Sequence, residues 1–281
     1  MNLKPLPNVI IKLIYEYVIF FPKTKEELQN AVNCWCSDEN KMKYGYISTW
    51  DTSFITDMNM LFNEKNFNDD ISNWNVSNVT DMSYMFSETE FNQPLNNWDV
   101  SNVTDMSGMF YFATQFNESI NKWDVGNVKN MHGMFCKALK INQMLGKWDV
   151  SNVKNMNGMF SSCLFFNQPL NKWNVSNVTD MSYMFNNCND FNNPLNKWDV
   201  SNVLDMSNMF YKACYFNKSI NSWNVSNVTN MSNMFNRSFR FNKPLNKWNV
   251  ANVTNYHCMF RHTNIENKKL PYLWRKKYNN N

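Results

Sequence analysis

Tryptophan recurs through this chain at almost constant intervals. Nine tryptophans stand 24 or 25 residues apart over most of the 281-residue sequence: Trp50, Trp74, Trp98, Trp123, Trp148, Trp173, Trp198, Trp223 and Trp248. A fixed period in the range of about 20–50 residues is typical of an array in which each repeat stacks on its neighbours. A unit this small cannot bury its own apolar face, so the period predicts one elongated array.

Each repeat contains the pattern L-x-x-W-x-V. From Trp74 onward, the third residue before each tryptophan is Leu or Ile, and the second residue after it is Val. The pattern matches the L-x-x-L-x-L core of a leucine-rich repeat, with tryptophan in the middle position. Residues two apart on an extended chain point to the same side. We therefore expect a short parallel strand in each coil, as over residues 122–125.

The apolar spacing changes in the second half of the repeat. After Trp98, apolar residues stand at Val103, Met106, Met109 and Phe110. These intervals of three, six and seven residues fit one face of a helical turn, and Thr104 and Asp105 stand where a helix N-cap is expected. The predicted fold class is a leucine-rich-repeat-like solenoid, with one short parallel strand and one short helical segment in each 24–25-residue coil.

Polar residues also form columns. From Trp74 onward, one asparagine stands four residues after each tryptophan of the series, as at Asn102, and another stands six residues before it, as at Asn92. Asparagine suits turns, and stacked amides can bond from coil to coil. An Asp or Asn seven residues after tryptophan, such as Asp105, is explained by helix capping; a calcium ladder would need several acidic residues in one turn. We therefore expect no metal site.

The two ends of the array differ from its middle. We divide the chain into an N-terminal helical cap over 1–45, a solenoid of about nine coils over 46–260, and a C-terminal cap and tail over 261–281. One cap helix is expected over 6–21 and a second from Thr24, where Glu27 completes a capping box. The residues expected to face the core in these caps are Leu28, Val32, Trp35, Leu270, Leu273 and Trp274.

Composition argues against several classes of protein. The net charge of +4 is only mildly basic, which is no signature of nucleic-acid binding. The apolar run over 6–21 contains Lys12 and Glu16 and has no cleavage site, so we expect neither a membrane span nor a signal peptide. Seven cysteines form no disulfide framework. An intracellular, cytoplasmic monomer with reduced thiols is the expectation.

Two segments resemble known families. The runs WDTSFITDMNMLF, from Trp50, and FNQPLNNWDVSNVTDMSGMF, from Phe91, resemble the BspA-like leucine-rich repeat family, and the resemblance extends over 22–260. That family comprises cell-surface and secreted proteins of bacteria, mycoplasmas and some protists, with roles in adhesion and host interaction. The segment LPNVIIKLIYEY, from Leu6, resembles the opening of an F-box. The first resemblance implies a binding protein without catalytic residues.

The residues themselves give no sign of catalysis. The three histidines have no repeated partner, and six glycines form no phosphate-binding loop. We therefore expect no enzyme activity and no cofactor. The predicted function is that of a non-enzymatic, protein-binding repeat scaffold with an unknown partner, acting in host or cell interaction. The alternatives are a structural or self-assembling component and an F-box-like adaptor.

The residues on either side of the tryptophans supply the candidate binding face. They point away from the core and form two charged ladders, which we expect to stack about 4.8 Å apart along the strands. The candidates are Lys122, Asp124, Lys147, Asp149, Lys172, Lys197, Asp199 and Lys247. Mutual compensation of charge on a solvated sheet is one interpretation. The functional hypothesis is that a partner of complementary charge docks there.

Overall fold

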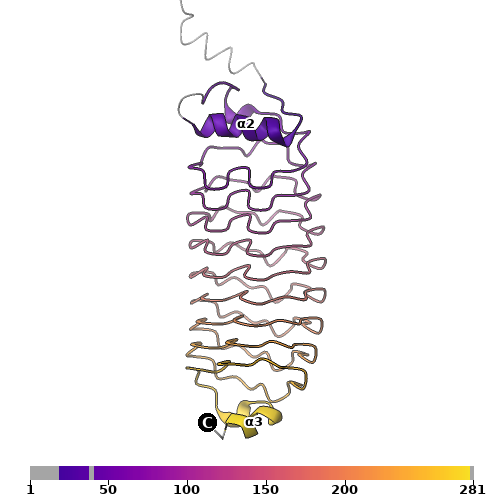
Figure 1. Cartoon of the computed structure of the whole chain (residues 1–281), viewed down its shortest axis with the longest axis vertical. Coiled ribbons are helices and arrows are strands. Elements are labelled where there is room, and N and C mark those ends of the chain that lie inside the picture. The colour runs from indigo at the N-terminus through magenta and orange to yellow at the C-terminus, as the bar shows by residue number, and fades with distance from the viewer. Residues whose placement is uncertain (1–18, 38–40, 279–281) are drawn as a thin grey trace, which may run out of the picture.

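The chain winds into a long column of stacked coils. A computed structural model describes residues 19–37 and 41–278, with α2 (Lys25–Cys36) at one end of the column and α3 (Tyr272–Tyr278) at the other (Figure 1). Two 3₁₀ helices, η1 (Ile47–Thr49) and η2 (Asn267–Lys269), lie next to the first and last coils. These described residues form no β-strand; isolated parallel bridges join the coils, from Asp57–Asp81 through to Asn230–Asn255.

The predicted parallel strand is wrong, because two turns occupy its place. Trp123 N donates to Ile120 O at 3.2 Å, which closes one turn, and Val128 N donates to Val125 O at 3.0 Å, which closes the next. Only the short segment 123–125 separates the two turns, which is too short to build a ladder. Contact with the preceding coil comes from a side chain instead: the indole Nε1 of Trp123 donates to Leu95 O at 2.8 Å.

The predicted helical segment is wrong as well, because it is a run of β-turns. Met109 N donates to Met106 O at 3.2 Å, an i to i+3 bond, whereas Met106 N donates across to Asn130 O of the next coil at 3.0 Å. Gly108 and Phe112 have φ values of 58° and 56°, which interrupt right-handed helical winding. The architecture of a leucine-rich-repeat solenoid, with a strand and a helix in each coil, is therefore not formed.

The aspartate column caps turns rather than helices. Asp105 Oδ1 accepts a hydrogen bond from Ser107 N at 2.7 Å, and Asp81 Oδ1 accepts one from Ser83 N at 2.8 Å. A carboxylate that bonds the backbone two residues on forms an Asx turn. The expected preference for Asp or Asn at this position is thus explained by turn chemistry.

The apolar columns meet in one continuous core, as the repeat predicts. Trp173 is 3% exposed, and the core side chains Met181, Met184 and Phe185 are 0% exposed. Trp173 and Trp198 stack with ring centroids 6.4 Å apart, and Phe185 and Phe210 stack at 5.7 Å. Each coil therefore buries its apolar side chains against the equivalent side chains of its neighbours.

Asparagine connects neighbouring coils on the outside of this core. Asn127 Nδ2 donates to Ser101 O at 2.7 Å, and Asn92 Oδ1 accepts from Asn117 N at 2.8 Å. The expected bonding from coil to coil does form, and most of it joins an amide side chain to backbone. These bonds satisfy backbone groups that a regular sheet would pair directly.

Helix α2 covers the first coil. Thr24 is its N-cap and accepts a hydrogen bond from Glu27 N at 3.2 Å. The side chains expected to face the core, Leu28, Val32 and Trp35, are buried, and Gln29 Nε2 donates to Leu61 O of the first coil at 3.1 Å. The expected helix over 6–21 and the F-box-like segment lie almost wholly outside the described residues.

The last coil is covered by η2 and α3. Leu270 and Trp274 are each 3% exposed, and the Trp274 ring packs edge-on against Phe260 with centroids 6.0 Å apart. Leu273 is 54% exposed, so its expected role in closing the core is wrong. In a single helical turn, adjacent residues point in different directions, and Trp274 takes the inward position.

Candidate functional site

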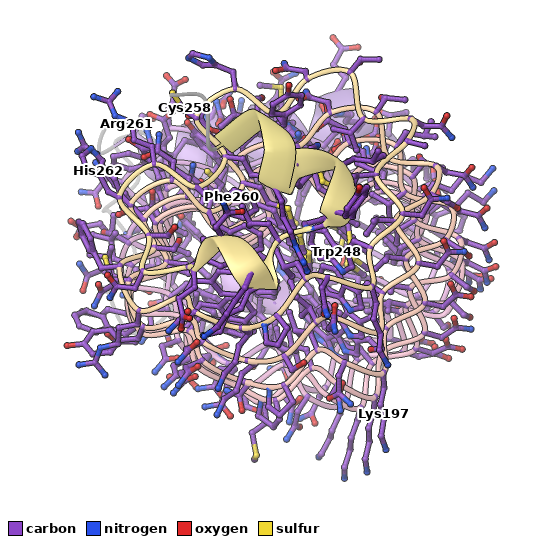
Figure 2. All side chains as sticks on the ribbon, turned by 90° about the horizontal axis from the view of Figure 1, so that it is seen from below. Lys197, Trp248, Cys258, Phe260, Arg261 and His262 are labelled. Atoms are coloured by element: carbon purple, nitrogen blue, oxygen red, sulfur yellow. The ribbon has the colours of Figure 1, made fainter. Side chains whose placement is uncertain are left out.

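Four lysines from consecutive coils form a row on the outside of the column. We call Lys122, Lys147, Lys172 and Lys197 the lysine row; all four are exposed. Ser222 occupies the same position in the next coil, and the exposed Lys247 follows one coil later. Viewed along the column, Lys197 points away from the core beside other nitrogen-tipped side chains (Figure 2). Backbones of paired neighbouring coils lie about 5 Å apart, so these positive charges are close together.

The turn before each tryptophan fixes the backbone of the lysine row. Lys197 N donates to Asn171 Oδ1 at 3.0 Å, and Lys122 N donates to Asn96 Oδ1 at 3.0 Å. In each case the asparagine belongs to the preceding coil, while the neighbouring tryptophan is buried. All four lysines lie in turns closed by the following tryptophan, from Trp123 N to Ile120 O through to Trp198 N to Leu195 O. Their stems therefore leave an ordered backbone, and the side chains are exposed.

The aspartates on the other side of each tryptophan bond to backbone. Asp124, Asp149 and Asp199 are exposed, and their Oδ1 atoms accept bonds of 3.0 Å from Gly126 N, Ser151 N and Ser201 N respectively. The Ser151 hydroxyl, followed by this backbone N–H, lowers the pKa of Asp149. Among the described residues, no ion pair joins the lysine row to these aspartates.

A hollow of about 400 Å³ lies in the middle of the lysine row. We call it the Met144 hollow, after a side chain that is 64% exposed. Its other lining residues are Asn121, Gly146, Lys147, Pro169, Asn171, Lys172 and Lys197. Three of these residues are basic and none is acidic. A second hollow of about 400 Å³, which includes Lys218 and Lys247 in its lining, lies further along the same face.

The Met144 hollow arises where one coil departs from the repeat. Four residues before tryptophan, coils from Trp98 onward carry Pro or Ser, except that one carries Met144. Two residues before tryptophan they carry Asn, except that the same coil carries Gly146. A Cβ at Gly146 would lie 2.6 Å from Pro169 O, so this close approach requires glycine. Comparison of the repeats position by position would have found the hollow; the charged columns alone did not.

The remaining reactive side chains do not form a further cluster. Within residues 19–37 and 41–278, no group of three or more His, Cys, Asp or Glu side chains could hold a metal ion. His257 and Cys258 contact each other at 3.1 Å on the surface. The seven cysteines form no disulfide in this structure, and burial raises the pKa values of the Cys163 and Cys188 thiols.

The fold and this surface define a repeat protein, built as a column of stacked turns with a basic row along one side. The chain belongs to the family described as Mycoplasma protein of unknown function, DUF285, which matches residues 29–143, 116–213 and 194–278. This match corrects the resemblance to the BspA-like leucine-rich repeat family, which was not matched. No curated protein matches the chain, and no solved structure does.

None of the helices in the described part of the chain is both long enough and apolar enough to cross a bilayer.

Proposed function

We propose that this protein is a non-enzymatic scaffold that binds another protein through the lysine row and the Met144 hollow, in a host- or cell-interaction role. One observation carries the proposal: in the described part of the chain no ion pair joins the four regularly spaced lysines to a carboxylate, and three of these lysines line a hollow beside an exposed apolar side chain. A cytoplasmic location and a monomeric state stay predictions from the sequence.

Energetics favour a partner that uses both features. A single exposed ion pair contributes only about 0.2–1 kcal/mol, so one lysine alone would hold a partner weakly. Several lysines on a preordered backbone act together, and an apolar side chain buried beside them adds contact area. Binding energy at protein interfaces is concentrated in such buried anchors, while surrounding charges select the partner and speed encounter.

The test is capture of a partner from the source cells by purified protein. Wild type should retain a defined protein in stoichiometric amount, and Lys147→Glu, Lys172→Glu and Lys197→Glu together should abolish its retention. The matched control changes Lys129, Lys137 and Lys154 to Glu, which are exposed lysines outside the row. Glu64 and Glu88 already adopt the positive φ found at Lys137 in equivalent turns, so the control should fold.

Equal capture by wild type and the lysine-row variant would contradict the proposal. Light scattering on the same preparations measures the alternative, a self-assembling component. Growth of wild type into large particles, without capture of any other protein, would favour that alternative.

A further inference from the structure

We propose that the occupant of the Met144 hollow is an extended acidic segment of the partner protein, with one apolar side chain seated against Met144 and carboxylates on either side of it. This inference rests on the proposed function and names the chemistry of the partner at that same surface.

The positive charge of the Met144 hollow favours an acidic segment of the partner. Lys147, Lys172 and Lys197 line the hollow, and no carboxylate does. The aspartates that follow the buried tryptophans in the sequence each accept a hydrogen bond from their own turn. Positive charges held at short spacing repel one another, and carboxylates placed among them relieve that repulsion. Complementary charge would also orient the segment along the row.

Spacing favours an extended segment that runs along the column. Three steps of about 4.8 Å separate the first lysine of the row from the fourth, a span of about 14 Å. An extended chain rises about 3.3 Å per residue, so roughly five residues cover this span. Its alternate side chains, about 6.6 Å apart on one face, lie within reach of flexible lysine stems. A helix rises only about 1.5 Å per residue, so it would need roughly ten residues to present a similar number of carboxylates over the same length.

The departure from the repeat supplies the apolar contact. Equivalent positions in the other coils from Trp98 onward carry Pro or Ser, whereas Met144 offers a long, polarizable side chain that is 64% exposed. Methionine adapts its shape to aliphatic and aromatic partners. Gly146 lets the backbone of Pro169 approach closely, and Pro169 contributes to the lining of the hollow from the next coil. An aromatic or aliphatic residue between the carboxylates would therefore bury its surface at the centre of the row.

The test measures binding of two labelled heptapeptides by fluorescence anisotropy at low ionic strength. One has six glutamates around a central phenylalanine, and the other is heptaglutamate. We expect wild type to bind the phenylalanine peptide at least about tenfold more tightly. Met144→Pro introduces the residue found at Pro169 in the following coil and should remove this preference. The lysine-row variant, in which Lys147, Lys172 and Lys197 are changed to Glu, should bind neither peptide. The control, in which Lys129, Lys137 and Lys154 are changed to Glu, should bind both peptides with wild-type affinity.

Equal affinity of wild type for the two peptides, or a preference that survives Met144→Pro, would overturn the inference. If Met144→Pro does not fold, Met144→Ser replaces it, because Ser119 and Ser219 stand at that position. Failure of both peptides to bind, while capture from cells still depends on the lysine row, would overturn this inference alone. If capture from cells does not depend on the lysine row either, the proposed function is overturned as well.

Discussion

Each core tryptophan both fills the interior and joins two coils. Trp173 is 3% exposed, its indole Nε1 donates to Leu145 O of the preceding coil at 2.9 Å, and its ring stacks on Trp198 of the following coil. Leucine in the same position would fill space without the N–H donor. The tryptophan column thus supplies hydrogen bonds between coils at a place where backbone strands do not pair.

Truncation of one central tryptophan should be costly. Trp173→Ala should destabilise the protein by about 3–5 kcal/mol, because burial is lost and a cavity remains. Trp173→Phe should be milder, with about 1 kcal/mol attributable to the lost indole hydrogen bond. Urea unfolding followed by circular dichroism measures both. A Trp173→Ala variant as stable as wild type would show that this column is not core.

Two glycines should respond differently to the same substitution. Gly146→Asn introduces the residue of neighbouring coils, yet its Cβ would lie 2.6 Å from Pro169 O, so we expect a clear loss of stability. Gly158→Asn should be nearly neutral, since Asn208 and Asn233 hold the same turn position at φ values of 57° and 56°. Thermal melting compares the pair. A reversed order of stabilities would contradict the local geometry.

At the scale of the element, apolar periodicity predicted which side chains are buried, but it did not predict the backbone conformation. Intervals of three and seven residues fit a helix, and they also fit consecutive turns closed by i to i+3 bonds. Glycine would have signalled the positive φ values of such turns. Gly108, Gly133 and Gly158 carry this signal in three coils, but Tyr84, Tyr183 and Asn208 hold the same position in others, so the signal does not recur through the array. Stacked hydrogen bonds to the next coil stabilise these conformations.

The candidate site could also be predicted only in part, because periodicity shows which side chains face outward but not how the coils approach each other. Regular columns identified the exposed lysines, because tryptophan fixes the inward direction and its neighbours must point outward. The Met144 hollow depends on a close approach between two coils, at Gly146 and Pro169. Such an approach is a tertiary property, so only the irregular residues of that coil could have indicated it.

Asp99 and Asp149, which cap the turns directly after Trp98 and Trp148, should make the stability of the protein depend on pH. Hydrogen bonds from the hydroxyls of Ser101 and Ser151, and then from their backbone N–H groups, lower the pKa values of Asp99 and Asp149. A lowered folded-state pKa gives stability that is present above the unfolded value of about 3.9 and lost as pH falls through the folded value.

Replacement of both residues by asparagine tests this contribution. Asn174 and Asn224 accept the same backbone bond in their own coils, so the double variant should fold normally at pH 7. Its urea midpoint should fall less than that of wild type between pH 7 and pH 3, since the amide does not titrate. An equal or larger fall in the double variant would show that these carboxylates do not contribute.

At the scale of the whole molecule, stability should depend on position along the column. Each coil contacts only its neighbours, so damage near an end leaves most of the stack intact. Trp248 lies next to the C-terminal cap, where Leu245 N donates to Lys269 O at 2.8 Å. Trp248→Ala should therefore lower the main melting temperature less than Trp173→Ala, and limited proteolysis should first remove the C-terminal coils. A larger loss for Trp248→Ala would contradict a stack of nearest neighbours.

The central claim is that stacked turns, rather than helical segments, join one coil to the next. Gly158 N donates to Ser182 O at 2.8 Å in the following coil, whereas a helix would direct the same N–H to residue 154. Scalar coupling through hydrogen bonds, measured by nuclear magnetic resonance on deuterated protein, identifies the acceptor carbonyl directly. We predict a coupling between the amide nitrogen of Gly158 and the carbonyl carbon of Ser182. A coupling from Gly158 to the carbonyl carbon of Lys154 would contradict the stacked-turn column.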